Sequence, residues 1–168
     1  MVAPVLFVVI FAGVDFGGYF ASRLSVENAA RVAVRDSTVD VCPTTLQTLG
    51  GASDQLGPKA KQFQVVFITV DPERDTPKQL NDYLTSAAYS RGVVGLTGSD
   101  DQIAAVTKAY GVYSQKQGTG ADYTVNHSSA IYLMNPKGQF DSVIPYGLTP
   151  DQVRERLVKA MRENDAGS

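Results

Sequence analysis

Hydrophobic and polar positions follow two different periods from residue 40 onward, and this alternation predicts strands interspersed with helices. Residues 64–70, "QVVFITV", and residues 93–97, "VVGLT", are rich in β-branched and aromatic side chains, so we expect both to be strands. The polar and apolar positions of residues 78–91 favour a helix between them. This order is typical of an α/β sheet covered by helices.

Capping boxes indicate where two further helices begin. Ser99 stands three residues before Gln102, which predicts a helix that continues to about Tyr110. Thr149 begins the same pattern, followed directly by a proline, and predicts a terminal helix over residues 150–164. One face of this terminal helix is apolar and should dock on the sheet. Its members are Val153, Leu157, Ala160 and Met161.

A hairpin is predicted shortly before the terminal helix. Residues 129–134, "SAIYLM", and residues 139–144, "QFDSVI", have the composition of strands, and the "NPKG" between them supplies turn residues. Residues 114–122, "SQKQGTGAD", are polar and contain two glycines. We expect this segment to be an exposed, flexible loop.

The N-terminal segment permits two interpretations. Residues 2–21 are apolar and about long enough to cross a bilayer, which favours a membrane anchor. Basic residues follow this stretch rather than precede it, so the positive-inside rule would leave the rest of the chain in the cytoplasm. Alternatively, residues 5–12, "VLFVVIFA", have the short, Val- and Ile-rich composition of a buried core strand. The sequence leaves both interpretations open.

Composition narrows the class of protein. The 168 residues are 43% hydrophobic and 19% charged with a formal net charge of −2, as in an ordinary globular protein without the basic excess of nucleic-acid-binding chains. We therefore expect no nucleic-acid partner. Cys42 and His127 are the only cysteine and the only histidine. An intramolecular disulfide, a cysteine-only metal cage and a multi-histidine zinc site are thereby excluded.

The single thiol lies at a position that favours metal binding or nucleophilic reactivity. Cys42 directly precedes Pro43, and a proline there is typical of the first turn of a helix. The unpaired amides and dipole of a helix start stabilise a thiolate, so Cys42 is a candidate metal ligand or nucleophile. An inert, buried cysteine is the alternative.

Five longer motifs follow one another along the chain: "DVCPTTL" at 40–46, "VVFITVDPERDTP" at 65–77, "GLTGS" at 95–99, "KAYGVY" at 108–113 and "YTVNHSSAIYLM" at 123–134. Together they resemble the motifs of one known family, the Sco/SenC proteins. The resemblance implies an α/β, thioredoxin-like fold with a central sheet flanked by helices. It also implies a copper-binding protein of the metallochaperone type, rather than an enzyme, that assists assembly of the copper centre of cytochrome c oxidase.

The same resemblance implies a metal site, with one departure. The family site is a Cys-x-x-x-Cys pair plus a distant histidine, which correspond here to Cys42 and His127, while the first cysteine is replaced by Thr38. A neutral hydroxyl is a poor donor to a soft ion, so we expect a weakened site for Cu(I) or Cu(II). Asp71 and Asp75 are candidates to orient the site, or else belong to a solvated charged turn.

The departure extends over the N-terminal region. Family members carry an apolar strand ahead of the cysteine pair, whereas residues 25–38 are polar and helix-like here. We therefore divide the chain into an atypical segment, residues 1–39, and a Sco/SenC-type domain, residues 40–168. The first segment is interpreted as a membrane anchor, a displaced core strand or the product of a wrongly joined reading frame.

Partners and location follow from the resemblance alone. It implies the cytochrome c oxidase subunit that carries the copper centre, or another copper chaperone, as partner. It implies a location on the periplasmic side of the bacterial inner membrane, or at the equivalent mitochondrial membrane. Two other functions remain open: a single-cysteine thiol peroxidase-like or redox enzyme on a thioredoxin scaffold, and a degenerate, inactive copy.

Overall fold

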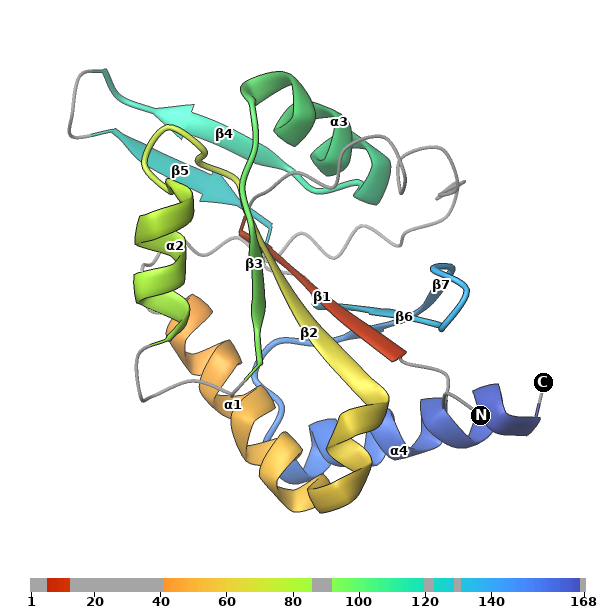
Figure 1. The fold of residues 1–168 in the computed structure, drawn as a ribbon. Coiled ribbons are helices and arrows are strands. Elements are labelled where there is room, and N and C mark those ends of the chain that lie inside the picture. Colours follow the sequence, from red (N-terminus) through yellow and green to blue (C-terminus); the bar gives the residue numbers. More distant parts are fainter. Residues whose placement is uncertain (1–5, 13–40, 86–91, 120–122, 129–130, 167–168) are drawn as a thin grey trace.

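The computed structural model describes residues 6–12, 41–85, 92–119, 123–128 and 131–166 (Figure 1). These residues form a five-stranded sheet, a separate two-stranded sheet, four α-helices and one 3-10 helix. In chain order the elements are β1 (Leu6–Ala12), α1 (Val41–Leu56), η1 (Gly57–Gln62), β2 (Phe63–Thr69), α2 (Pro77–Leu84), β3 (Val94–Leu96), α3 (Asp100–Tyr110), β4 (Ser114–Gln117), β5 (Thr124–His127), β6 (Ile131–Met134), β7 (Phe140–Ile144) and α4 (Pro150–Ala166).

The N-terminal strand β1 lies at the centre of the larger sheet, whose order is β3-β2-β1-β6-β7. It pairs in parallel with β2 along its whole length and antiparallel with β6. Val9 is buried, with 5% of its surface exposed. Because β1 has a partner on each side, its backbone donors and acceptors complete the hydrogen bonding of both neighbours.

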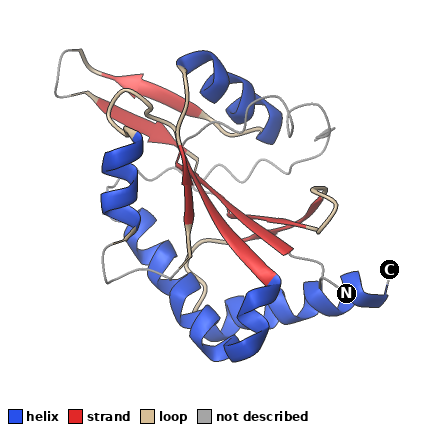
Figure 2. Cartoon of the chain, viewed as in Figure 1, coloured by secondary structure: helices blue, strands red, loops and turns tan. Residues whose placement is uncertain are grey.

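Helices surround the sheet (Figure 2). The helices α1 and α4 pack against each other, with Leu46, Leu49 and Leu157 fully buried. The short helix α2 lies against β3, where Gly95 leaves room for two buried leucine side chains of α2. The predicted α/β architecture is therefore confirmed.

Both predicted capping boxes are present. The Ser99 amide donates to Gln102 Oε1 at 2.8 Å, and the Gln102 amide donates back to the serine hydroxyl at 3.4 Å. The box that opens α4 has the corresponding distances of 3.0 and 3.3 Å. The predicted apolar face of α4 is buried, as expected. A third box opens α2 at Thr76 and was not predicted.

Two boundaries differ from the predictions. The helix expected over 78–91 ends at Leu84, and residues 86–91 lie outside the described residues. The loop expected over 114–122 is wrong in part, because residues 114–117 form β4 and pair with β5. These four residues are exposed, as expected. Because all four are polar, the sequence shows no alternation of apolar and polar positions from which the strand could be predicted.

The N-terminal segment is described only over residues 6–12, which form β1. The remainder of the candidate anchor, residues 2–21, and the polar stretch 25–38 lie outside the described residues. Within the described ranges, no helix has both the length and the apolar character needed to cross a membrane.

Candidate functional site

Cys42 lies at the start of α1, the helix that precedes β2. Cys42 is the second residue of α1, and the structure describes its backbone but not its side chain. The helix leads through η1 into β2. Figure 1 shows α1 and β2 running in opposite directions, so that α1 starts on the side of the molecule toward which β2 ends.

His127 is the last residue of β5 and is half-buried. The following strand, β6, begins at Ile131, which pairs with Ile10 near the carboxyl end of β1. His127 precedes this point by four residues. From the chain order and strand pairing we therefore expect His127 and the start of α1 to lie near the carboxyl ends of β1 and β2.

Local hydrogen bonds fix the backbone at His127. The Ser128 amide donates to the Tyr113 carbonyl at 2.9 Å, and the Tyr113 amide donates to the Ser128 hydroxyl at 3.1 Å. The imidazole Nδ1 lies 3.3 Å from the Ser128 carbonyl oxygen. With the proton on Nδ1, this contact leaves the lone pair of Nε2 for a metal ion.

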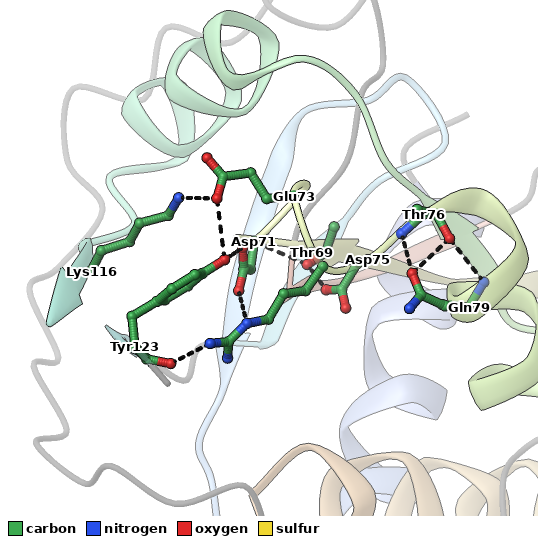
Figure 3. Close-up of polar contacts among 9 residues, drawn as sticks. Thr69, Asp71, Glu73, Asp75, Thr76, Gln79, Lys116 and Tyr123 are labelled. Carbon is green, nitrogen blue, oxygen red and sulfur yellow. Dashed lines mark hydrogen bonds and ion pairs between the residues drawn. The ribbon is translucent and has the colours of Figure 1, made fainter. Parts of the chain in front are cut away.

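The predicted carboxylates Asp71 and Asp75 lie in the loop that follows β2 (Figure 3). Asp71 is buried and accepts a hydrogen bond from the Tyr123 hydroxyl at 2.7 Å. Asp75 accepts a hydrogen bond from the hydroxyl of Thr69, the last residue of β2. Asp71 thus has partners in this loop and in the residue before β5, and Asp75 has a partner in β2. The role of the two carboxylates in orienting a metal ligand stays a prediction.

The environment of Asp75 shifts its titration. Burial raises the pKa of the Asp75 carboxyl above its usual value of 3.8, and the nearby Asp71 carboxylate adds to this increase. The hydrogen bond from Thr69 and the charge of Arg74 act in the opposite direction. Since the folded state holds this proton more tightly than the unfolded state, the carboxyl contributes stability at low pH that is lost as the pH rises through its folded pKa.

We therefore expect Asp75→Asn to change how stability depends on pH. Well below pH 3.8 the wild-type side chain is neutral in both states, whereas above its raised folded pKa the folded protein holds a partly buried charge that the variant lacks. The free energy of unfolding of the variant, relative to wild type, should increase between pH 3 and pH 7. Urea unfolding at both pH values measures this, with the exposed Asp54→Asn as control. An equal pH response in both variants would contradict the expectation.

Sequence reasoning missed the contacts of Tyr123 and Lys116. Arg74 Nη2 donates to the Tyr123 carbonyl at 2.6 Å, and its guanidinium lies 3.7 Å from the centre of the Tyr123 ring. The ammonium of Lys116 lies 4.7 Å from the same ring centre and pairs with Glu73 at 2.8 Å. The pairing raises the pKa of Lys116 and lowers that of Glu73. The sequence signal that could have predicted this hairpin is the pair of glycines at 118 and 120, which lies between "SQKQ" and "YTVN".

The described side chains do not by themselves complete a metal cage. Among them, no three histidine, cysteine, aspartate or glutamate side chains gather in a way that could hold a metal ion. A site at this end of the sheet therefore depends on Cys42, whose side chain lies outside the described part. A thiolate and a neutral imidazole are together a donor set suited to a soft or borderline transition metal.

The fold is that of a thioredoxin-like α/β protein. The copper-bound structures of ScoI from Bradyrhizobium japonicum and from Arabidopsis thaliana superpose with TM-scores of 0.71 and 0.73, at 30% and 28% sequence identity. The alignments cover 94% and 96% of this chain and 86% of each of those chains. The predicted fold class is confirmed.

The sequence comparison identifies the family. The SCO1/SenC family model matches residues 37–162, so the chain belongs to the SCO1/SenC family. The mitochondrial SCO1 homolog 1 of Arabidopsis thaliana is 36% identical over 126 residues, which are 74% of this chain and 37% of that protein. The chain spans between 37% and 61% of the length of the first curated relatives that it matches.

The N-terminal segment is similar to a different family. Residues 1–35 match the model of TadE-like proteins, and the SCO1/SenC match begins two residues later. The match to TadE-like proteins includes all of β1. The central strand of the SCO1/SenC-type sheet therefore comes from a segment whose sequence resembles another family.

Proposed function

We propose that this chain binds a copper ion through Cys42 and His127 and acts as a metallochaperone in assembling the copper centre of cytochrome c oxidase. The chain order and strand pairing support this most strongly, because they lead us to expect the start of α1 and His127 at the same end of the sheet. Membership of the SCO1/SenC family and the copper-bound structural neighbours agree with it. The activity is binding and transfer of copper rather than catalysis.

The donor set explains why we propose a weakened site. A thiolate and an imidazole suit Cu(I), whereas the hydroxyl of Thr38 adds little because it is a hard, neutral donor. Two protein ligands hold the ion less tightly than the three of the family pattern. Without a second cysteine, an intramolecular dithiol–disulfide exchange is excluded.

The partner and location are proposed on the same grounds. The partner would be the oxidase subunit that carries the copper centre, or another copper chaperone. The protein would act on the periplasmic side of the bacterial inner membrane or at its mitochondrial equivalent. The SCO1 homolog 1 of Arabidopsis thaliana and the SCO2 homolog of Bos taurus are mitochondrial proteins.

Competition with a chromogenic Cu(I) chelator under reducing conditions tests this function. We expect one equivalent of Cu(I) to bind, and Cys42→Ala and His127→Ala each to weaken the affinity at least about tenfold, because each removes one of two protein ligands. Lys137→Ala, on the exposed turn after β6, is the control. Equal affinity in wild type and Cys42→Ala would overturn the proposal, and a peroxide-dependent sulfenic acid at Cys42 would instead favour the thiol enzyme.

A further inference from the structure

The hairpin formed by β4 and β5 carries His127 but does not belong to the larger sheet. Its two strands pair with each other, with Ser114 opposite His127 at one end and Gln117 opposite Thr124 at the other. A two-stranded hairpin alone is only marginally stable in water. Contacts with the rest of the fold must therefore decide where this hairpin, and with it His127, is held.

Tyr123, the residue directly before β5, makes the main described contacts with the body of the protein (Figure 3). The Arg74 guanidinium lies 3.7 Å from the centre of its ring and donates a hydrogen bond to its carbonyl oxygen at 2.6 Å. The tyrosine hydroxyl donates to Asp71 Oδ1 at 2.7 Å. Arg74 and Asp71 thus hold both the side chain and the backbone of one residue.

The other half of this arrangement is anchored in the larger sheet. Asp71 is buried and lies two residues after the end of β2. Its amide donates to the Thr69 hydroxyl at 3.0 Å, and its carbonyl accepts from the amides of Arg74 and Asp75 at 3.2 and 3.0 Å. These bonds form a tight turn directly after β2. The turn fixes Asp71 and Arg74 relative to the larger sheet.

The neighbouring ion pair between Lys116 and Glu73 contributes less to this arrangement. Their side chains are 43% and 54% exposed, and exposed ion pairs stabilise proteins little. Asp71, in contrast, is 12% exposed in its side chain, so its hydrogen bond to Tyr123 is partly shielded from water, whereas the Arg74 side chain is 44% exposed. A planar guanidinium that stacks on a ring while donating to a carbonyl also fixes orientation in a way that a lysine does not.

We infer that Arg74, Asp71 and Tyr123 form a clamp that positions His127 by fixing the β4–β5 hairpin to the turn after β2. These three are positioning residues, since they act on the proposed ligand through the strand that carries it. The expected effect of the clamp on copper binding rests on the proposed function, in which His127 is a copper ligand. The geometric part, the placement of the hairpin, is independent of any metal.

Nuclear magnetic resonance of the metal-free chain tests the clamp, because His127 gives the only imidazole signals. We expect Arg74→Gln and Tyr123→Ala to shift and broaden these signals, and to speed amide exchange in β4 and β5 at least tenfold, while amides of β1 and β2 exchange as in wild type. Lys78→Gln, which breaks an exposed ion pair on α2, is the matched control. Cu(I) affinity should fall three- to tenfold in the two clamp variants.

A conservative variant separates the parts of the clamp. Tyr123→Phe keeps the ring against Arg74 and the main-chain carbonyl but removes the hydrogen bond to Asp71, so we expect roughly a threefold increase in hairpin exchange. Unchanged imidazole signals and hairpin exchange in all clamp variants would overturn the inference. Equally faster exchange in β1 and β2 would also overturn it, since the residues would then support the whole fold. A wild-type chain that binds no copper would refute the proposed function while leaving the exchange result as the test of the clamp.

Discussion

Thr38→Cys should raise the affinity for Cu(I) by about a hundredfold. The substitution restores the family's Cys-x-x-x-Cys pair with Cys42 and adds a thiolate, the donor type that Cu(I) prefers. Four-ligand zinc sites gain roughly 10–16 kcal/mol on binding, which corresponds to about 3 kcal/mol for each ligand. Since a tenfold change in affinity is about 1.4 kcal/mol, one added ligand accounts for roughly two powers of ten.

Chelator competition measures this gain directly. Thr38→Ser is the matched control because it keeps a hydroxyl and should leave the affinity unchanged. The double variant Thr38→Cys/Cys42→Ala should return the affinity close to that of wild type, since it again has one thiolate. An affinity of Thr38→Cys equal to that of Thr38→Ser would mean that position 38 does not face the ion bound by Cys42.

Val9→Asp should destabilise the fold by more than about 4 kcal/mol. Val9 is buried in β1, between β2 and β6, and a carboxylate at this position would lose its water without gaining a partner. Domains of this size are stable by only about 5–15 kcal/mol, so such a loss removes much or all of the folded population. The substitution tests whether the TadE-like segment is an essential part of the sheet.

Urea unfolding followed by circular dichroism measures the effect. Val94→Asp in the edge strand β3 is the control, because Val94 is 39% exposed and a charge there remains in water. We expect this control to cost less than about 1 kcal/mol. Equal stability of Val9→Asp and Val94→Asp would show that β1 is not the central strand in solution.

A segment similar to another family can serve as β1 because sheet pairing is made by the backbone. The amides and carbonyls of β2 and β6 require an extended neighbour, and the side chains of that neighbour need only be apolar and suited to a strand. Residues 6–12, "LFVVIFA", meet both conditions. The strand interpretation of this segment was available from composition, whereas its pairing with β2 and β6 depends on residues more than 50 positions away and could not be derived from a local pattern.

Local signals predicted the elements that depend on local contacts. The capping box at Ser99 and the apolar face of α4 could be predicted because each is a residue pattern that lies within a few helical turns. The strand β4 could not, since its polar residues are ordered by pairing with β5 and by contacts with the turn after β2. Its exposed side chains give no hydrophobic period.

The same distinction applies to the candidate site. Cys42 and His127 could be predicted as ligands from motifs, because a family pattern links residues that are distant in sequence. Tyr123 was missed because its partners, Arg74 and Asp71, lie 49 and 52 residues earlier in the chain. Charged residues in a loop give no indication of which distant ring they will contact.

X-ray absorption at the copper edge of the Cu(I)-loaded chain tests most directly whether Cys42 and His127 bind one ion. The account predicts scattering from one sulfur and one imidazole in the copper shell, with the imidazole contribution lost in His127→Ala and the sulfur contribution lost in Cys42→Ala. A copper shell that keeps the same composition in both variants would contradict it.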